Sequence, residues 1–117
     1  MGGIVMKATE LMVGDWILYG DTPVRVLQLS ENGKYGWVEP IPLTPEILEK
    51  NGFWVMEKVD NGAEEYIAYA TDGLVFHYNR DNDYYFPNTP ISWRYVHELQ
   101  YILRLCGLDE LADNFKV

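Results

Sequence analysis

The stretch YVHELQYILRLCG, residues 95–107, contains the longest helical pattern in the chain. Its apolar residues recur at helical spacing and share one face: Val96, Leu99, Leu103 and Cys106, with Ile102 beside them. The polar residues fall off that face: His97, Glu98, Gln100 and Arg104. Gly107 stands where a helix commonly ends on a left-handed residue, which predicts a helix from Tyr95 to Cys106. Such a helix needs an apolar surface to cover, and a sheet would supply it.

Turn-forming residues such as Asn32-Gly33 and Asp72-Gly73 divide the rest of the chain into short apolar runs. These runs predict strands at residues 16–19, 23–29, 35–39, 53–59, 66–70, 74–78 and 84–86. One short helix interrupts them, because Thr44-Pro45-Glu46 combines an N-cap residue, a first-turn proline and an acid. Asn51-Gly52 ends that helix.

The order of elements predicts an α+β fold, in which a curved antiparallel sheet is covered by the C-terminal helix. The short strands and tight turns after Gly14-Asp15-Trp16 resemble small SH3-like barrels, so we expect SH3-like barrel character in the N-terminal half. At 117 residues the chain predicts a single domain over residues 1–117. Residues 1–6 are expected to be a disordered extension, with the natural start at either Met1 or Met6.

The chain is acidic, with 18 Asp and Glu residues, 9 Lys and Arg residues and a formal net charge of −9. This charge argues against direct binding to nucleic acid or to anionic membranes, where basic residues must neutralise phosphates. It leaves basic protein partners open, including a DNA-binding protein for which an acidic surface would imitate nucleic acid. The single cysteine, Cys106, favours a reducing, cytoplasmic compartment, and no stretch approaches the ~20 apolar residues of a membrane span.

Few residues fit a catalytic site. His77 and His97 are the only histidines, and nothing in their spacing brings them together as zinc ligands. Cys106 falls at the C-terminal end of a helix, where the helix dipole disfavours a thiolate. No nucleophile elbow or phosphate-binding glycine loop is present. We therefore expect no catalytic residues, no cofactor and no metal ligands, and a hydrolase or metalloenzyme built on His77 and His97 stays a remote alternative.

A partial calcium-loop pattern follows the predicted strand at residues 74–78. Asn79, Asp81 and Asp83 are spaced like the first ligands of such a loop. Tyr84 and Pro90 then stand where the loop needs a glycine and a bidentate glutamate. The pattern therefore indicates a solvated hairpin loop.

Three patches carry a resemblance to known sequences: residues 7–16, residues 39–53 and residues 95–100. The first contains KATEL and GDW, the second EPIPLTPEIL and NGF, and the third YVHELQ. Together they resemble a family of small uncharacterised Bacteroidetes proteins associated with phages and mobile elements. The resemblance implies a bacterial or phage cytoplasmic accessory protein, and it supplies no catalytic residues.

Aromatic residues crowd the second half of the chain, and several predicted strands carry them on both faces. Aromatic side chains left at the surface favour protein interfaces, whereas the scarcity of Lys and Arg argues against a stacking platform for nucleic acid. The predicted interaction surface consists of Tyr84, Tyr85, Trp93, Tyr95, His97 and Tyr101. We therefore expect a non-enzymatic protein-interaction module, with a protein partner or self-association. The alternative is an acidic decoy that imitates nucleic acid.

Overall fold

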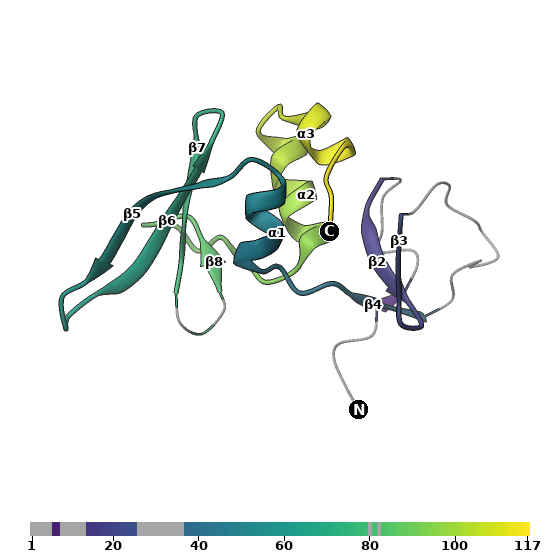
Figure 1. The fold of residues 1–117 in the computed structure, drawn as a ribbon, viewed down its shortest axis with the longest axis horizontal. Coiled ribbons are helices and arrows are strands. Elements are labelled where there is room, and N and C mark those ends of the chain that lie inside the picture. Colours follow the sequence, from purple (N-terminus) through teal and green to yellow (C-terminus); the bar gives the residue numbers. More distant parts are fainter. Residues whose placement is uncertain (1–5, 8–13, 26–36, 80, 82) are drawn as a thin grey trace. The chain divides into compact units, whose positions relative to one another are not determined.

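A computed structural model of the protein describes residues 6–7, 14–25, 37–79, 81 and 83–117 (Figure 1). The chain divides into two compact units. The terminal unit combines residues 1–43 with residues 95–117, and the central unit consists of residues 44–94. The prediction of a single domain stays a prediction. Residues 1–5 of the expected extension lie outside the described residues, and Met6 begins the first strand.

The terminal unit contains a four-stranded antiparallel sheet with the strand order β1-β4-β2-β3. Its strands are β1 (Met6–Lys7), β2 (Trp16–Tyr19), β3 (Thr22–Arg25) and β4 (Trp37–Pro40). β2 and β3 form a hairpin in which Tyr19 pairs with Thr22, as the turn residues Gly20-Asp21 indicate. The predicted turn at Asn32-Gly33 and the predicted strand residues 26–29 lie outside the described residues.

The predicted C-terminal helix is confirmed as α2 (Val96–Leu105), which is followed by the short α3 (Asp109–Asp113). The Val96 N–H donates to the Ile41 carbonyl at 2.8 Å, so the start of α2 is held by the segment after β4. At the other end, Gly107 has a φ of +79° and the Leu108 N–H donates to the Leu103 carbonyl at 2.8 Å. This ending places Gly107 in the left-handed region, where a β-carbon would be unfavourable.

The buried side of α2 differs from the predicted one at two positions. Its apolar residues are buried as predicted: Val96, Leu99, Ile102 and Leu103. Cys106, however, is exposed, because the helix ends at Leu105 and Cys106 is the C-cap residue. Gln100, which the sequence places off the apolar face, is fully buried. Both predictions were wrong because the spacing of apolar residues does not show at which residue a helix ends or what a polar side chain can bind.

The side-chain amide of Gln100 joins three parts of the terminal unit. Its Oε1 accepts a hydrogen bond from the Trp16 N–H at 2.9 Å, at the start of β2. Its Nε2 donates to the Gly14 carbonyl at 2.8 Å and to the Ala112 carbonyl of α3 at 3.0 Å. The amide oxygen and both amide hydrogens therefore have partners, which offsets the cost of burying the group.

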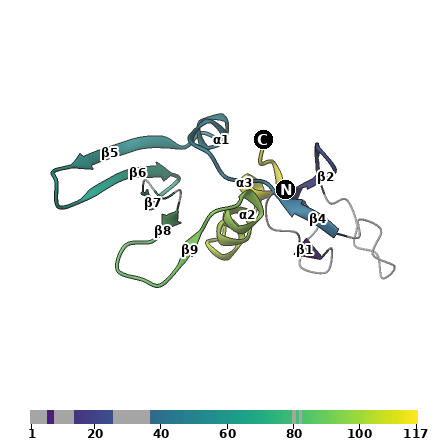
Figure 2. The same ribbon diagram turned by 90° about the horizontal axis from the view of Figure 1, so that it is seen from below.

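The central unit begins with α1 (Pro45–Lys50) and continues as an antiparallel meander in the order β5-β6-β7-β8-β9 (Figure 2). Its strands are β5 (Trp54–Asp60), β6 (Glu65–Thr71), β7 (Leu74–Tyr78), β8 (Tyr84–Tyr85) and β9 (Ser92–Trp93). The Thr44 Oγ1 accepts from the Ile47 N–H at 3.2 Å, which confirms Thr44 as the N-cap of α1.

A two-residue turn sets the register of the central sheet. Asp72 and Gly73 have φ values of +45° and +83°, which is the geometry that tight hairpin turns require. Thr71 then pairs with Leu74, and Ala68 pairs with His77. The turn predicted from Asp72-Gly73 is therefore confirmed.

One face of the central sheet is its core. Phe76 in β7 is fully buried, and its ring centroid lies 5.2 Å from that of Trp93 and 5.5 Å from that of Phe53. Tyr69 and Tyr84 pack on the same ring, at 6.2 Å and 6.0 Å. Because side chains alternate along each strand, the neighbours of these residues point to the opposite face.

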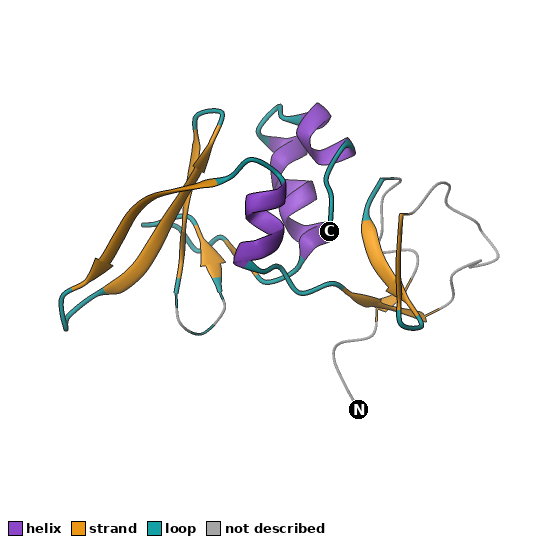
Figure 3. Ribbon diagram, in the orientation of Figure 1, coloured by secondary structure: helices purple, strands orange, loops and turns teal. Residues whose placement is uncertain are grey.

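The described residues form an α+β fold with two antiparallel sheets and a C-terminal helix, which confirms the predicted class (Figure 3). Both sheets are open, and no barrel closes among the described strands. Within the terminal unit, α2 packs against β2 and α3. None of the helices in the described part of the chain is long and apolar enough to cross a membrane.

Replacing Gln100 by leucine tests the role of its amide. The variant Gln100→Leu removes all three hydrogen bonds of the amide. The Trp16 N–H loses its acceptor, and the carbonyls of Gly14 and Ala112 lose their donor. We expect a loss of about 2–4 kcal/mol in the free energy of unfolding, measured by urea denaturation, because unsatisfied buried groups are costly. Hydrogen exchange of the Trp16 amide should accelerate as well.

Tyr101→Ala, on the exposed side of the same helix, is the matched control and should change stability by less than about 1 kcal/mol. Equal stability of Gln100→Leu and wild type, with unchanged Trp16 exchange, would contradict this role of the amide.

Candidate binding surface

The face of the central sheet opposite to its core carries a row of aromatic rings. His77 in β7 pairs with Ala68 in β6 and with Tyr85 in β8, and Tyr66 points to the same face as Ala68. The Tyr66 and His77 rings stack with centroids 4.1 Å apart and planes 5° from parallel. The His77 and Tyr85 rings meet edge to face, at 5.6 Å and 79°. We call Tyr66, His77 and Tyr85 the aromatic row.

Glutamates lie beside the aromatic row. The Tyr66 hydroxyl donates to Glu57 Oε1 at 2.9 Å, so a carboxylate of β5 is held at one end of the row. Glu64 and Glu65 line a hollow of about 440 Å³ together with the row itself and with Pro87 and Asn88. We call this space the outer hollow. Among the described residues that line it, none is a lysine or an arginine.

Two turns position the walls of the outer hollow. In the turn between β5 and β6, the Asn61 Oδ1 accepts from the Ala63 N–H at 3.0 Å and from the Glu64 N–H at 2.8 Å. On the other side, the Phe86 N–H donates to the Ile91 carbonyl at 3.1 Å, and Asn88 has a φ of +65°. These contacts hold the segments that carry Glu64 and Asn88 in defined positions.

Burial and the nearby glutamates act in opposite directions on His77. Desolvation lowers the pKa of the His77 imidazole below its ordinary value, and the charges of Glu57 and Glu64 partly offset this by raising it. The lowered pKa favours a neutral ring near pH 7. The pKa of the Tyr66 hydroxyl is raised, first by its hydrogen bond to Glu57, so that Tyr66 remains a donor.

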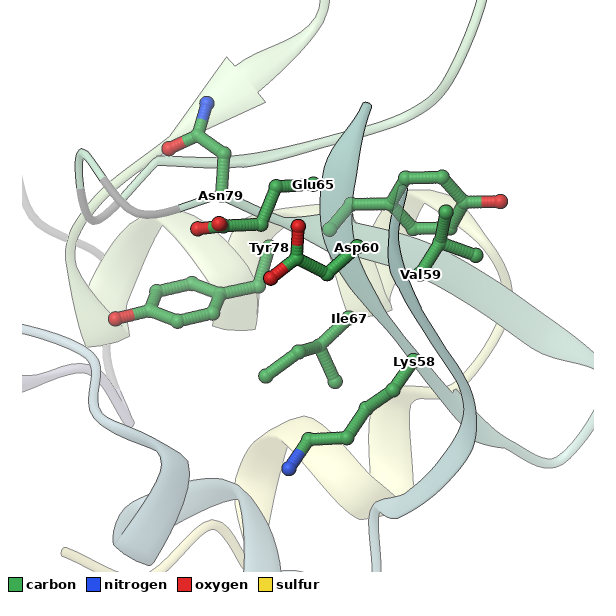
Figure 4. A pocket seen from close by; sticks show the side chains of 8 residues that line it. Lys58, Val59, Asp60, Glu65, Ile67, Tyr78 and Asn79 are labelled. Atoms are coloured by element: carbon green, nitrogen blue, oxygen red, sulfur yellow. The ribbon is translucent and has the colours of Figure 1, made fainter. Parts of the chain in front are cut away.

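A second hollow, of about 580 Å³, lies at the ends of β5, β6 and β7. Asp60 pairs with Glu65 across β5 and β6, which places two like charges opposite each other. Figure 4 shows both carboxylates on the side of the Tyr78 ring, while the Lys58 amine points away from them. Glu65 lines both hollows, so the acidic character continues around this end of the sheet.

The residues predicted to form the interaction surface divide between the two units, three in each. Tyr84 and Trp93 are 0% and 2% exposed and pack on Phe76, so their predicted place at a surface is wrong. Tyr85, the neighbour of Tyr84, points to the opposite face and belongs to the aromatic row. The alternation within Tyr84-Tyr85-Phe86 is the physical reason, because successive side chains must point to opposite faces.

The other predicted residues lie in the terminal unit. Tyr101 on α2 is 53% exposed. Tyr95 and His97 are half-buried, and their rings lie 6.2 Å apart and nearly parallel. Tyr95 and His97 form an aromatic pair at the start of α2, and Tyr101 lies further along the same helix.

Sequence reasoning missed Tyr66 and His77 as members of one surface. Tyr66 was expected in a strand, and His77 was considered only as a metal ligand. The signal was the turn at Asp72-Gly73, since a two-residue hairpin loop fixes which residues of the two strands share a face. Counting back from that turn pairs Ala68 with His77 and brings Tyr66 diagonally onto the same ring.

Among the described residues, no group of three or more His, Cys, Asp and Glu side chains is arranged to hold a metal ion. His77 belongs to the central unit and His97 to the terminal unit. In the loop that partly matches a calcium site, the Asn79 Oδ1 accepts from the N–H groups of Asp81 and Asp83 at 2.9 and 3.2 Å. That oxygen therefore closes the hairpin loop.

Comparison of the chain with models of protein families, with curated proteins and with solved structures finds no match.

Replacing His77 by phenylalanine tests its neutral, stacked state. Because the folded-state pKa is lowered from 6.5, protonation favours the unfolded chain. The stability that neutral His77 contributes is present above pH 6.5 and is lost as the pH falls below it towards the folded-state pKa. Wild type should therefore lose more free energy of unfolding than His77→Phe between pH 7.5 and 5.5, measured by urea denaturation.

His97 and all the carboxylates are present in both proteins, so the comparison isolates the replacement of His77. Parallel pH profiles of the two proteins would show that His77 titrates alike in the folded and unfolded states.

Proposed function

We propose that the protein is a non-enzymatic protein-interaction module and that its central unit presents an aromatic and acidic face to a protein partner. The observation that supports this proposal is the aromatic row on the face opposite to the core, with Glu57, Glu64 and Glu65 beside it. Aromatic rings are enriched at protein interfaces because they bury much apolar area while their polar atoms stay hydrogen-bonded.

The edge strand extends the same face. Trp54 of β5 pairs with Ala70, which shares the face of Ala68 and His77. The Trp54 side chain is 56% exposed, and the next residues, Val55 and Met56, are exposed as well. Val55 pairs with Tyr69 of the core face, so the exposed apolar side chains of this edge strand do not all share the face of Trp54. Exposed large apolar side chains on an edge strand are nevertheless typical of interaction surfaces. A second copy of the chain is one form that the partner could take.

We also propose the setting that the sequence favours, a cytoplasmic accessory protein of a bacterium or phage related to the Bacteroidetes family that the chain resembles. The lone cysteine, exposed at the end of α2, supports a reducing compartment, where it would persist as a free thiol. SH3-like character of the N-terminal half stays part of this proposal, supported by the antiparallel β2–β3 hairpin and the pairing of β2 with β4.

Tyr85→Ala tests the proposed surface. Bait proteins would be incubated with nuclease-treated bacterial lysate and washed at low and then high salt, and retained proteins would be quantified by mass spectrometry. We expect the partner that wild type retains to be depleted about tenfold or more for Tyr85→Ala, as for a truncated aromatic anchor. The free energy of unfolding should stay within about 1 kcal/mol of wild type.

Tyr101→Ala is the matched control, because it removes an equally large tyrosine from the exposed side of α2 in the other unit. Depletion by Tyr101→Ala and not by Tyr85→Ala would move the interface to α2. Equal retention by all three baits would contradict the proposal. A basic DNA-binding protein that Tyr85→Ala still retains and high salt releases would instead favour the acidic decoy.

A further inference from the structure

The strand β5 (Trp54–Asp60) forms one end of the central sheet. It pairs with β6 on one side, and no other described strand lies along its second side. All of its residues are exposed except Val59, which is half-buried. An edge strand offers its outward N–H and C=O groups to a further strand, so this edge is a candidate for pairing between chains.

One hydrogen bond shows which backbone groups of β5 point towards this edge. The Asn61 N–H donates to the Glu64 carbonyl at 3.1 Å, so the backbone of Asn61 faces β6. Backbone groups alternate in direction along a strand, so Val59 also faces β6. The N–H and C=O groups of Lys58 and Asp60 therefore point outward, away from β6.

The turn at Asp72-Gly73 gives the same alternation by a second route. A two-residue hairpin loop makes its flanking residues, Thr71 and Leu74, a hydrogen-bonded pair, so Thr71 faces β7. Alternation back along β6 then directs the backbone of Tyr66 towards β5, where Tyr66 pairs with Val59. Val59 faces β6 by both routes, and its two neighbours face the edge.

The side chains of Lys58 and Asp60 share one face of the sheet. They are two residues apart in β5, and their pairing with β6 places both on the face of the core. Val59 pairs with Tyr66 and lies on the other face. Within one chain, the Lys58 amine points away from the Asp60 carboxylate (Figure 4). The edge therefore presents a positive and a negative side chain two residues apart on one face.

We infer that β5 pairs antiparallel with β5 of a second copy of the chain, with Lys58 of each copy opposite Asp60 of the other. This inference rests on the proposed function, since it takes a second copy as the protein partner, and it names the surface and the register. A dimer with twofold symmetry uses the same strand on both sides, so each contact occurs twice. Opposite charges at directly opposite positions stabilise an antiparallel pair.

Symmetry and charge together select this register. The twofold axis between two antiparallel edge strands is perpendicular to the sheet, so residues opposite each other share a face. Lys58 opposite Lys58, or Asp60 opposite Asp60, would bring like charges together, whereas Lys58 opposite Asp60 brings opposite charges together twice. In this register Val59 of each copy lies at the axis, where the two apolar side chains meet.

The β-bulge limits the paired stretch. The register of β5 against β6 shifts between Val55 and Glu57, so regular pairing extends from Glu57 to the turn at Asn61. A bulge and a lysine on an edge strand discourage pairing with arbitrary strands. Both are compatible with a second copy, because the bulge lies outside residues 57–61 and the lysine meets an aspartate. The chain's own β5 is therefore a better partner for this edge than an arbitrary strand.

The test measures self-association of the full chain by sedimentation velocity over a range of about 5 to 500 μM. We expect a dimer whose fraction rises with concentration. Lys58→Asp and Asp60→Lys should each weaken association about tenfold or more, because each puts like charges opposite each other in both symmetric contacts. The double variant Lys58→Asp with Asp60→Lys should restore association to within about threefold of wild type, because the opposite charges face each other again.

These variants contain a control for overall charge. Lys58→Asp makes the acidic chain more negative, Asp60→Lys makes it less negative, and the double variant leaves the net charge unchanged. Overall repulsion would therefore shift the two single variants in opposite directions, and that result would overturn the assigned register. Equal association of wild type and all three variants would overturn it as well. Both side chains are exposed, so the urea midpoints should stay close to that of wild type.

A cysteine at the twofold axis tests the register without changing any charge. Val59→Cys, in a Cys106→Ala background, places two thiols opposite each other at a separation that a disulfide can span. Mild oxidation should link this variant into a dimer on a non-reducing gel. Ala63→Cys in the same background is the matched control, since Ala63 is exposed in the turn and its two copies lie far apart along the paired strands. Equal linking of both variants, or of neither, would overturn the register.

The outcomes separate this inference from the proposed function. A chain that is monomeric at every concentration but retains a Tyr85-dependent partner would overturn the β5 dimer and leave the proposed function. Self-association that shows the Lys58 and Asp60 pattern and persists in Tyr85→Ala would support the dimer, because Tyr85 belongs to β8 and not to the β5 edge. Absence of both self-association and a Tyr85-dependent partner would reject the inference and the proposed function together.

Discussion

The buried amide of Gln100 is the contact on which the terminal unit depends. It connects Gly14 and Trp16, at the start of β2, with Ala112 in α3, although these residues lie at opposite ends of the sequence. An unpaired amide in the core would be costly, whereas this one has a partner for each donor and for its acceptor. The amide therefore fixes one arrangement of strand and helices, which apolar packing alone would define less sharply.

Charged groups connect the same parts of the terminal unit, the start of β2 and the helices α2 and α3. Asp15 is almost fully buried and accepts from the Arg104 Nη1 at 2.9 Å, while the Arg104 Nη2 lies 3.7 Å from Asp113 Oδ1. Gly14 has a φ of +96°, and a β-carbon there would lie 3.1 Å from the Arg104 Nη2. The Trp16 indole N–H donates to the Phe115 carbonyl at 2.6 Å. The Gly14-Asp15-Trp16 sequence is thus explained by contacts with α2 and the C-terminal segment.

The sequence predicted the fold class, both principal helices and the Asp72-Gly73 turn, because each depends on local residue preferences. It did not predict the burial of Gln100, since the partners of Gln100 lie 84 and 86 residues away in sequence and helical spacing records only apolar character. Tyr84 and Tyr85 were equivalent in the sequence, as both are tyrosines of one short run. Only the register of β7 and β8 decides that Tyr84 enters the core and Tyr85 the aromatic row.

The aromatic row lies on the face opposite to the core of the central unit. The core face already contains Phe76 with its surrounding rings, and the small residues Ala68 and Ala70 fill the buried part of the other face. A sheet whose outer face served only to contact water would be expected to carry polar side chains there. Instead, half-buried rings are stacked on one another beside glutamates that make the space acidic. This arrangement is the observation that supports the proposed recognition of a partner.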